Sequence, residues 1–369
     1  MTDALLPPGS IALVLGTRPE IIKLAEVARL LGSAARVIYT GQHYDERLGP
    51  RFFHELGLPA AHVVLTVGGA PRAQQIGGAV VAVDRHFAEQ PPLAVIVQGD
   101  TNATVAGALA ANARDVPLVH VEAGLRSHDR AMPEEHNRII VDHLADLCCA
   151  PTDTARDNLA REGISGERVV VTGNTVVEAL LRLVPPQSRR RDLVRRRGLV
   201  PDAFVLSTFH RPENVDDPER LADVLHQLAS LTLPVVLPLH PRTAARLRDF
   251  GLGSMLDALR VTDPMSYGDF LGLAGECAFM VSDSGGVQEE ASVLRRPVIV
   301  VRNSTERPEV LGTFARLVPP GAGIAELAAS WTADLGALHE QLRALASPYG
   351  DGSASTRCVA ATHELLSRQ

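Results

Sequence analysis

Lysine is almost absent from this chain, because 35 of its 36 basic residues are arginine and the exception is Lys23. Such a bias indicates a GC-rich genome in which lysine codons drift to arginine. Lys23 is therefore either a chance survivor on a solvated helix face or part of a site that needs the compact point charge of an ammonium group rather than a guanidinium fork.

Long apolar runs and cysteine motifs are missing as well. No run reaches the roughly 18 apolar residues of a membrane span, and Met1-Thr2-Asp3 lacks the basic start of a signal peptide. The four cysteines include no Cys-x-x-Cys pair, which argues against a disulfide framework or a zinc knuckle and favours reduced thiols. A net charge of -7 argues against a nucleic-acid groove. We therefore expect a cytoplasmic protein with neither nucleic-acid nor membrane partners.

The 369 residues suffice for two domains of roughly 150–200 residues each, and the first half has the pattern of a parallel sheet. Short runs that are apolar throughout alternate with helical stretches such as Pro19–Leu31 and Thr104–Ala113. This pattern is typical of strands that helices cover on both faces. The predicted strands are Ile11–Leu15, Arg36–Tyr39, Val63–Val64, Leu93–Val97, Leu118–Val121 and Val169–Thr172.

A second α/β series follows Pro185-Pro186 and the basic run Arg189–Arg197. We interpret these as an interdomain linker and a solvated helix rather than a nucleic-acid arm. The fold class predicted is α/β, with two Rossmann-like, doubly wound domains of residues 1–180 and 181–350 that face an interdomain cleft. Ligands of such sheets bind beyond the carboxyl ends of the strands, so the cleft is the expected site. The strands predicted in this half are Phe204–Thr208, Pro234–Leu239, Phe279–Ser282 and Val298–Val301.

The first strand leads into Gly16-Thr17-Arg18-Pro19-Glu20 instead of a Gly-x-Gly-x-x-Gly dinucleotide fingerprint. Arg18 and Lys23 are therefore expected at a strand end beside a helix amino terminus. Two cations and a helix amino terminus together form a strong anion receptor.

Acidic residues follow the next strands. Asp100 and Glu122 each stand at a strand end, and Glu134 opens a helix, so three carboxylates can converge on one cavity as acids or bases. Asp100 or Thr101 can equally be a helix N-cap, and Glu134 can complement a helix dipole. Four histidines crowd the same region without the H-E-x-x-H spacing of a zinc site, so we expect no metal. They are His120, His128, His136 and His143.

In the second half, Ser284-Gly285-Gly286 occupies a strand-to-helix turn, where backbone N–H groups can approach a diphosphate at the positive end of a helix. Glu290, about one turn into that helix, can accept hydrogen bonds from ribose hydroxyls. His210 and His240 each stand beside an arginine at a strand end, which favours anion binding. Arg307 adds a cation near the diphosphate turn.

Eight motifs in this order resemble the non-hydrolysing UDP-N-acetylglucosamine 2-epimerase family over nearly the whole chain. They are Gly16–Glu20, Gly41-Gln42-His43, Gly99-Asp100-Thr101, Val121–Arg126, Pro133–Arg138, His210–Asn214, Asp283–Glu290 and Thr305–Glu309. The resemblance implies the two-domain fold of GT-B glycosyltransferases, with a final helix within residues 351–369 that packs back on the first domain. It also implies a homodimer that needs neither a cofactor nor a metal.

By the same resemblance, Asp100, Glu122 and Glu134 are the acid/base carboxylates, and His210 is linked to catalysis. The implied reaction eliminates UDP to give 2-acetamidoglucal, then adds UDP back while a proton reaches the opposite face of C2. Arg18, Lys23, His210 and Arg307 would supply positive charge to the departing diphosphate. The residues implied to bind the UDP-sugar are Arg18, Lys23, His210, Phe270 (stacked on uracil), Ser284, Gly285, Gly286, Glu290 and Arg307.

Other activities fit these residues. A hydrolysing epimerase would release UDP and free N-acetylmannosamine, a glycosyltransferase would need an acceptor, and a subset of the family acts on UDP-2,3-diacetamido uronic acids. A metal-dependent hydrolase built on the histidines ranks last. The segment between Glu122 and Glu134 is shorter than in many bacterial members, and Tyr44-Asp45 follows the Gly-Gln-His motif. Activation by a second UDP-sugar is therefore not implied.

The substitution Lys23→Arg tests whether the single lysine matters. It keeps the charge but replaces a compact ammonium with a planar fork, so we expect turnover to fall. Steady-state kinetics of the purified variant measure the effect. Turnover equal to that of the wild type would make Lys23 a chance survivor.

Overall fold

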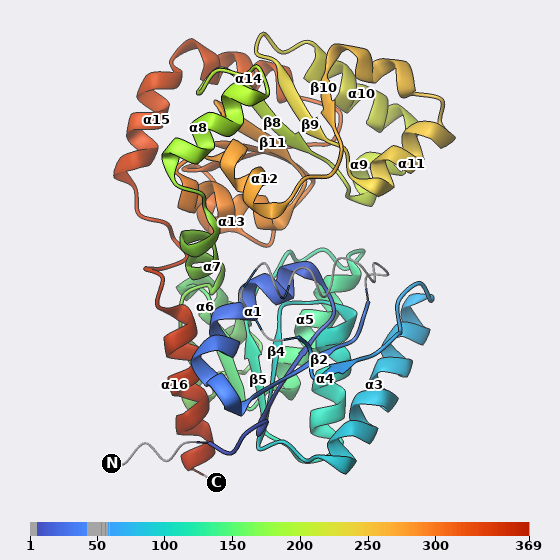
Figure 1. Ribbon diagram of the computed structural model, residues 1–369, viewed down its shortest axis with the longest axis vertical. Helices are drawn as coiled ribbons and strands as arrows, with labels where there is room; N and C mark the ends of the chain where they lie inside the picture. Colours follow the sequence, from blue (N-terminus) through green and yellow to red (C-terminus); the bar gives the residue numbers. More distant parts are fainter. Residues whose placement is uncertain (1–5, 43–52, 54–55, 57, 59, 369) are drawn as a thin grey trace. The chain divides into compact units, whose positions relative to one another are not determined.

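The computed structural model describes residues 6–42, 53, 56, 58 and 60–368. The chain divides into two compact units (Figure 1), of which unit 1 comprises Met1–Ala179 and Tyr349–Gln369 and unit 2 comprises Leu180–Pro348. No described helix is both long and apolar enough to cross a membrane. His43, the last residue of the Gly-Gln-His motif, and Tyr44-Asp45, which follow it, lie outside the described residues.

Unit 1 is built on a parallel sheet whose described strands follow the order β3-β2-β1-β4-β5-β6-β7. The predicted strands are confirmed to within a residue or so at each end, but β6 was not predicted. Its four residues begin only two residues after a helix ends, so no change of periodicity separates them. The strands are β1 (Ile11–Leu15), β2 (Ala35–Tyr39), β3 (Val63–Val64), β4 (Ala94–Gln98), β5 (Leu118–Val121), β6 (Leu147–Ala150) and β7 (Val169–Val171).

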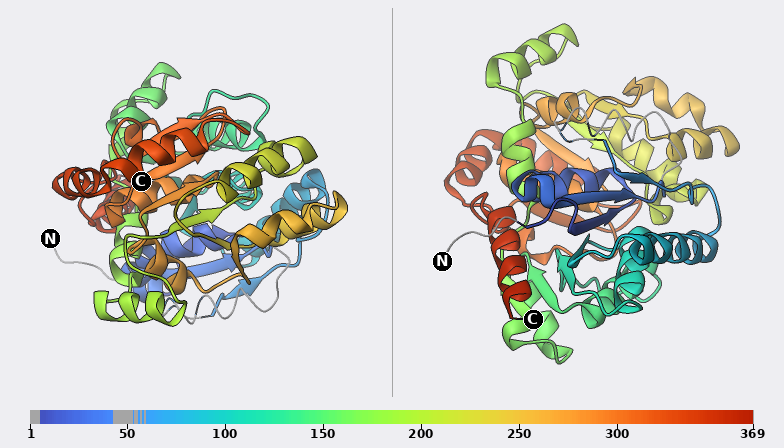
Figure 2. Two further views of the ribbon diagram at one scale, coloured as in Figure 1. Left: turned by 90° about the horizontal axis from the view of Figure 1, so that it is seen from above. Right: turned by 60° about the horizontal axis from the view of Figure 1, so that its bottom comes forward.

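Helices cover both faces of this sheet. The connection from β1 to β2 runs opposite to that from β4 to β5, so right-handed crossovers place their helices on opposite faces. The helix after β1 packs beside the last helix of the chain, as Figure 2 also shows, while α3, α4 and α5 pack side by side. The helices are α1 (Arg18–Leu31), α3 (Arg72–Glu89), α4 (Asn102–Asn112), α5 (Pro133–Leu144), α6 (Asp153–Arg161), α7 (Val176–Leu183), which continues into unit 2, and α16 (Ala354–Ser367).

Unit 2 has a second parallel sheet, in which the described strands follow the order β10-β9-β8-β11-β12-β13. The four central strands were predicted, but the edge strands β10 and β13 were not. The strand β10 has only three residues, and arginine or threonine stands beside the apolar residues of both edge strands. The strands are β8 (Val205–Thr208), β9 (Val235–Pro238), β10 (Arg260–Thr262), β11 (Phe279–Ser282), β12 (Val298–Val301) and β13 (Ala315–Val318).

The basic run after Pro185-Pro186 forms a helix, as predicted. This helix, α8 (Gln187–Arg196), packs its buried Leu193 against Gly272 of α12, where an added methyl group would lie 2.9 Å from the leucine. The other helices of unit 2 are α9 (Pro212–Val215), α10 (Pro218–Ala229), α11 (Pro241–Asp249), α12 (Tyr267–Ala274), α13 (Gly285–Leu294), α14 (Ile324–Ala333) and α15 (Leu335–Ala344).

Gly124, in the turn after β5, and Gly163, after α6, form a matched pair for a test of packing, because both have φ +82°. A Cβ on Gly124 would lie 2.3 Å from the carbonyl oxygen of Ala155, whereas one on Gly163 would meet open space. Gly163→Ala should lower the free energy of unfolding by about 1 kcal/mol through backbone strain alone. Gly124→Ala should cost about 1–3 kcal/mol more because it adds overpacking.

Urea unfolding of the two variants and the wild type measures this difference. Equal losses of stability would show that the backbone of α6 does not hold the β5 turn as closely as the structure indicates.

Candidate active site

A buried glutamate, Glu20, organises the loop after β1. Its Oε2 accepts hydrogen bonds from the backbone N–H groups of Gly16 and Thr17 at 3.1 and 2.7 Å, and from the Thr17 hydroxyl at 2.7 Å. Its Oε1 accepts the hydroxyl of Thr101 at 2.9 Å, and Thr101 in turn caps α4 by accepting the N–H of Thr104. One carboxylate therefore ties the turn after β1 to the helix start after β4.

Lys23 lies in α1 and is buried, which rules out its interpretation as a chance survivor on a solvated face. Its ammonium group lies 2.5 Å from Oε2 of Glu122, and both side chains are more than nine-tenths buried. The sequence prediction of Lys23 as part of an anion receptor is therefore incomplete, because its observed partner is a carboxylate of the protein. Arg18, the first residue of α1, is half-buried at the same strand end.

Glu122 follows β5 directly and has a left-handed backbone, with φ 67°. A residue with a side chain adopts this conformation at a cost in energy, and such strain concentrates at functional sites. Besides Lys23, the carboxylate accepts a hydrogen bond at 3.2 Å from Nδ2 of Asn174, in the turn after β7. The sequence analysis identified Glu122 but missed Asn174, since no local pattern links residues so distant in the chain.

Asp100 and Glu122 follow neighbouring strands, because β4 and β5 pair in parallel with Gln98 opposite Val121. Asp100 is partly exposed and accepts two hydrogen bonds from the guanidinium of Arg138, at 3.0 and 2.6 Å. Glu134 is the second residue of α5, the helix that carries Arg138, and is half-buried. All three predicted carboxylates thus follow strands of the unit 1 sheet, two in turns and Glu134 at the start of a helix.

The second glutamate of the Pro-Glu-Glu motif, Glu135, has a different environment from Glu134. It is buried and accepts hydrogen bonds from the backbone N–H groups of Ser127 and His128, at 2.9 and 3.0 Å. Arg138 also binds it, at 2.7 Å. Glu135, rather than Glu134, therefore binds the loop before α5 and holds it in place.

The histidines near Glu122 do not gather around a metal position. His120 is fully buried between Asp142, 2.6 Å from its Nδ1, and the carbonyl oxygen of Gly99, 2.8 Å from its Nε2. Within the described part of the chain, no group of three His, Cys, Asp or Glu side chains could hold a metal ion. His120 therefore has a structural role beneath the Asp100 turn.

In unit 2, Asp283 connects the loops after two neighbouring strands, β8 and β11. It is fully buried and accepts hydrogen bonds from the N–H groups of His210 and Arg211, at 3.1 and 2.9 Å, and from Nδ2 of Asn214 at 3.1 Å. The sequence analysis quoted Asp283 only as part of a motif. An acidic residue just before the Ser-Gly-Gly turn was the available signal.

His210 lies next to His240, with ring centroids 5.1 Å apart. Burial lowers the pKa of His210 to about 4, and nearby Arg211, His240 and Arg242 add to this effect, although Asp283 opposes it. The lowered pKa favours the neutral imidazole near pH 7, whereas the Asp283 carboxylate, 3.3 Å from Nδ1, favours the charged form. The role of His210 as a positive charge for a diphosphate stays a prediction.

The Ser284-Gly285-Gly286 turn begins α13, and Gly285 leaves room for a protein side chain. A Cβ on Gly285 would lie 2.6 Å from Nη1 of Arg307 and 2.7 Å from Oε1 of Glu306. Arg307 is buried and binds both Glu306 and Glu289, the latter at 2.7 Å through Nε. The predicted cation is thus already neutralised by two glutamates. A Cβ on Gly286 would meet nothing closer than 3.9 Å, so Gly286 leaves more room for a ligand.

Helix α12 carries two aromatic residues, one of which, Tyr267, contacts the predicted ribose-binding glutamate. The hydroxyl of Tyr267 donates a hydrogen bond to Oε1 of Glu290 at 2.7 Å, and Glu290 is buried. Phe270 is half-buried one turn further along α12. These residues bring an aromatic ring and a carboxylate to the helix that begins at the Ser-Gly-Gly turn.

Comparison with known proteins identifies the family. The family model for UDP-N-acetylglucosamine 2-epimerase matches residues 27–363. The chain belongs to this family. The UDP-N-acetylglucosamine 2-epimerase of Methanocaldococcus jannaschii is 38% identical over 320 residues, which cover 84% of this chain and 87% of the relative. The UDP-2,3-diacetamido-2,3-dideoxy-D-glucuronate 2-epimerase of Pseudomonas aeruginosa is 34% identical over 353 residues, covering 93% and 96%.

Solved structures of 2-epimerases share the fold. The crystal structure of the M. jannaschii UDP-GlcNAc 2-epimerase in complex with UDP-GlcNAc and UDP matches with a TM-score of 0.84 and 35% identity, covering 96% of this chain and 99% of that chain. The structure of the Neisseria meningitidis UDP-GlcNAc 2-epimerase bound to UDP-GlcNAc matches with a TM-score of 0.86 and 29% identity, covering 96% and 99%. The predicted GT-B-like α/β fold class and the predicted family are confirmed.

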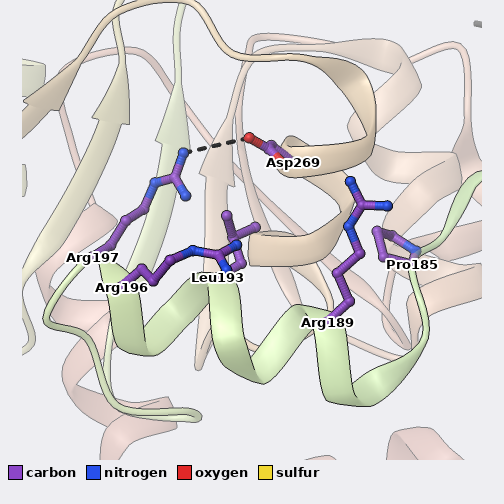
Figure 3. Close-up of a pocket in the computed structure, with 6 residues that line it drawn as sticks. All are labelled: Pro185, Arg189, Leu193, Arg196, Arg197 and Asp269. Carbon is purple, nitrogen blue, oxygen red and sulfur yellow. Dashed lines mark ion pairs between the residues drawn. The ribbon is translucent and has the colours of Figure 1, made fainter.

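A pocket in unit 2 contains none of the site residues predicted for a 2-epimerase. It lies between α8 and α12 (Figure 3), and Arg197 at its edge is 3.6 Å from Asp269. Arg189 and Arg196 also line it, around Leu193. These arginines belong to the helix that the sequence marked as a solvated basic run.

Glu20 should make the stability of this 2-epimerase family member depend on pH. Burial raises the pKa of Glu20 from 4.5 to about 7, against the opposing effect of its hydrogen bonds. The folded chain therefore binds more protons than the unfolded chain between these values, so this contribution to stability is present below the lower value and is lost as pH rises through the higher one. From pH 5 to pH 8, Glu20→Gln should gain about 2 kcal/mol of stability relative to the wild type.

Urea unfolding of both proteins at the two pH values measures this change. A constant difference between variant and wild type would mean that Glu20 titrates alike in the folded and unfolded chains.

Proposed function

We propose that the protein interconverts UDP-N-acetylglucosamine and UDP-N-acetylmannosamine. The observation that carries the proposal is the Glu122 carboxylate, which is buried and held by Lys23 in a strained turn at the carboxyl edge of the unit 1 sheet. Membership of the 2-epimerase family across nearly the whole chain supports it.

The proposed reaction begins with elimination. A carboxylate takes the C2 proton, the C2–H electrons form the C1=C2 double bond of 2-acetamidoglucal, and the C1–O electrons leave with UDP. In the return step the UDP oxygen attacks C1, and a carboxylic acid delivers a proton to the opposite face of C2. Acid/base groups are required on both faces of C2, and we assign this work to the three carboxylates Asp100, Glu122 and Glu134. Each positioned group of this kind contributes about 10²–10⁴-fold.

We propose that UDP binds to unit 2. The N–H groups at the start of α13, at Ser284, Gly285 and Gly286, would receive the diphosphate, because a helix amino terminus stabilises an anion. Glu290 would accept the ribose hydroxyls, and Phe270 would stack on uracil.

The cations proposed for the diphosphate differ in their observed state. Arg307 is engaged with two glutamates. Because burial lowers the pKa of His210, we propose that His210 acts at the leaving oxygen as a hydrogen-bonding imidazole. Lys23 is engaged with Glu122. Arg18 and the helix amino termini are further positive groups in the proposal. The proposed setting is the cytoplasm, as the composition predicts, and the proposed assembly is a homodimer, as the family resemblance implies.

A second candidate substrate is a UDP-2,3-diacetamido uronic acid. The relative from P. aeruginosa that bears this activity in its name aligns with 93% of this chain, whereas the M. jannaschii relative aligns with 84%. The C2 chemistry is the same for both substrates, so the residues proposed for catalysis do not change.

Incubation with UDP-N-acetylglucosamine in D₂O, with and without EDTA, tests the proposal. UDP-N-acetylmannosamine that carries deuterium at C2, formed regardless of EDTA, would support it. Free sugar and UDP would indicate a hydrolysing epimerase, and turnover only with an added acceptor would indicate a glycosyltransferase. Turnover of the diacetamido uronic acid alone would favour the second candidate, and loss of turnover in EDTA would indicate a metal enzyme.

The substitutions Asp100→Asn, Glu122→Gln and Glu134→Gln should each lower kcat by about 10²–10⁴-fold, because each removes a proton-transfer group. The Kd for UDP, measured by calorimetry, should change far less. Asp84→Asn is the matched control, since Asp84 of α3 forms a surface ion pair with Arg114, which lies in the turn after α4. Any of the three variants that turns over like this control does not carry the assigned role.

A further inference from the structure

Asn174 is the second group that binds Glu122, and its position is fixed from several sides. Its side chain is buried, with Nδ2 donating to Glu122 at 3.2 Å and Oδ1 accepting the N–H of Val176 at 3.0 Å. The two contacts together determine the orientation of the amide, because one requires a donor and the other an acceptor. Asn174 therefore starts α7 and presents an N–H donor to the Glu122 carboxylate.

The returning end of the chain closes on the same turn. The N–H of Asn174 donates to the carbonyl oxygen of Tyr349 at 2.8 Å, and Nη1 of Arg357 donates to the carbonyl of Thr172 at 2.9 Å. Gly173 has φ +85°, and a Cβ there would lie 3.1 Å from the Tyr349 oxygen. The segment that leaves unit 1 and the segment that re-enters it thus hold the Asn174 backbone between them.

Lys23 and Asn174 act on Glu122 in different ways. The ammonium of Lys23 ends a flexible four-carbon stem and attracts the carboxylate without fixing its direction. The Asn174 amide has a short side chain on a backbone that Tyr349 holds, so it can fix the direction of the carboxylate as well as favour its charged form. Lys23 of α1 is a charged group that lies directly against Glu122.

We infer that Asn174 is a positioning residue for Glu122, and that the returning segment at Tyr349 holds it in place. The inference rests on the proposed function, since it assigns a role to the carboxylate that exchanges the C2 proton. The segment before α7 and the segment that begins at Tyr349 are therefore joined at Asn174, the residue that contacts this carboxylate.

Two variants separate positioning from folding. Asn174→Asp keeps the acceptor for Val176 at the start of α7 but places a second carboxylate against Glu122. Asn174→Ala removes both contacts. We expect kcat to fall about 10- to 100-fold in Asn174→Ala, as for loss of a hydrogen bond to a charged group, and further in Asn174→Asp. The KM for the UDP-sugar and the Kd for UDP should stay within about threefold in both, because the carboxylate contact does not involve the nucleotide.

The pH profile gives a readout that a merely structural role would not move. Both variants favour the neutral form of Glu122, so the limb of the kcat profile that Glu122 sets should move to higher pH. In the direction in which Glu122 abstracts the proton this is the acidic limb, and activity returns as pH rises. In the opposite direction it is the basic limb.

Ser355→Ala is the matched control. Ser355 is a buried residue of α16 that binds Glu178 of α7, so its loss disturbs the packing of the returning segment without touching Glu122. It should lower the melting temperature while leaving kcat and both pH limbs close to those of the wild type.

Two results would overturn the inference: kcat and pH limbs of Asn174→Asp equal to those of the wild type, or matching changes in Ser355→Ala at a similar loss of melting temperature. Failure of the proposed function can be told apart from failure of this inference, because the wild type would then show no deuterium exchange at C2.

Discussion

The buried ion pair between Lys23 and Glu122 is the interaction on which the carboxyl edge of unit 1 depends. It joins α1 to the end of β5 and occupies a position from which water is almost excluded. Removing one partner of such a pair commonly costs about 3–5 kcal/mol, because the other charge is left buried and uncompensated. A guanidinium fork in place of the ammonium would need more room and a different set of acceptors. This constraint gives a physical reason for a single lysine in a chain that otherwise uses arginine.

Buried carboxylates recur as anchors for the loops at the strand ends. Glu20, Glu135 and Asp283 each accept hydrogen bonds from two backbone N–H groups of a loop, and each binds at least one side chain as well. Such groups hold the turns in place, while Asp100 and Glu134 beside them are more exposed. The acidic motifs of this sequence therefore combine an anchoring residue with a neighbour that is available for chemistry.

The sequence predicted the buried central strands well because their apolar runs and the intervening helices repeat along the chain. It did not predict β10 and β13, whose edge positions relax the requirement for apolar residues. It singled out Lys23 and Glu122 but not their contact, and it missed Asn174 because that contact joins segments 52 residues apart. It assigned positive charge to His210, whereas burial lowers the pKa of this imidazole. Charge state and long-range partners follow from packing, which a one-dimensional pattern does not report.

A crystal structure of the Glu122→Gln variant with UDP-N-acetylglucosamine bound tests the central claim most directly. The account predicts that the carboxamide of residue 122 lies about 3–3.5 Å from C2 of the sugar, as reacting groups do in a productive complex, and still contacts Lys23 and Asn174. A sugar ring whose C2 faces other residues, with position 122 out of its reach, would contradict the account.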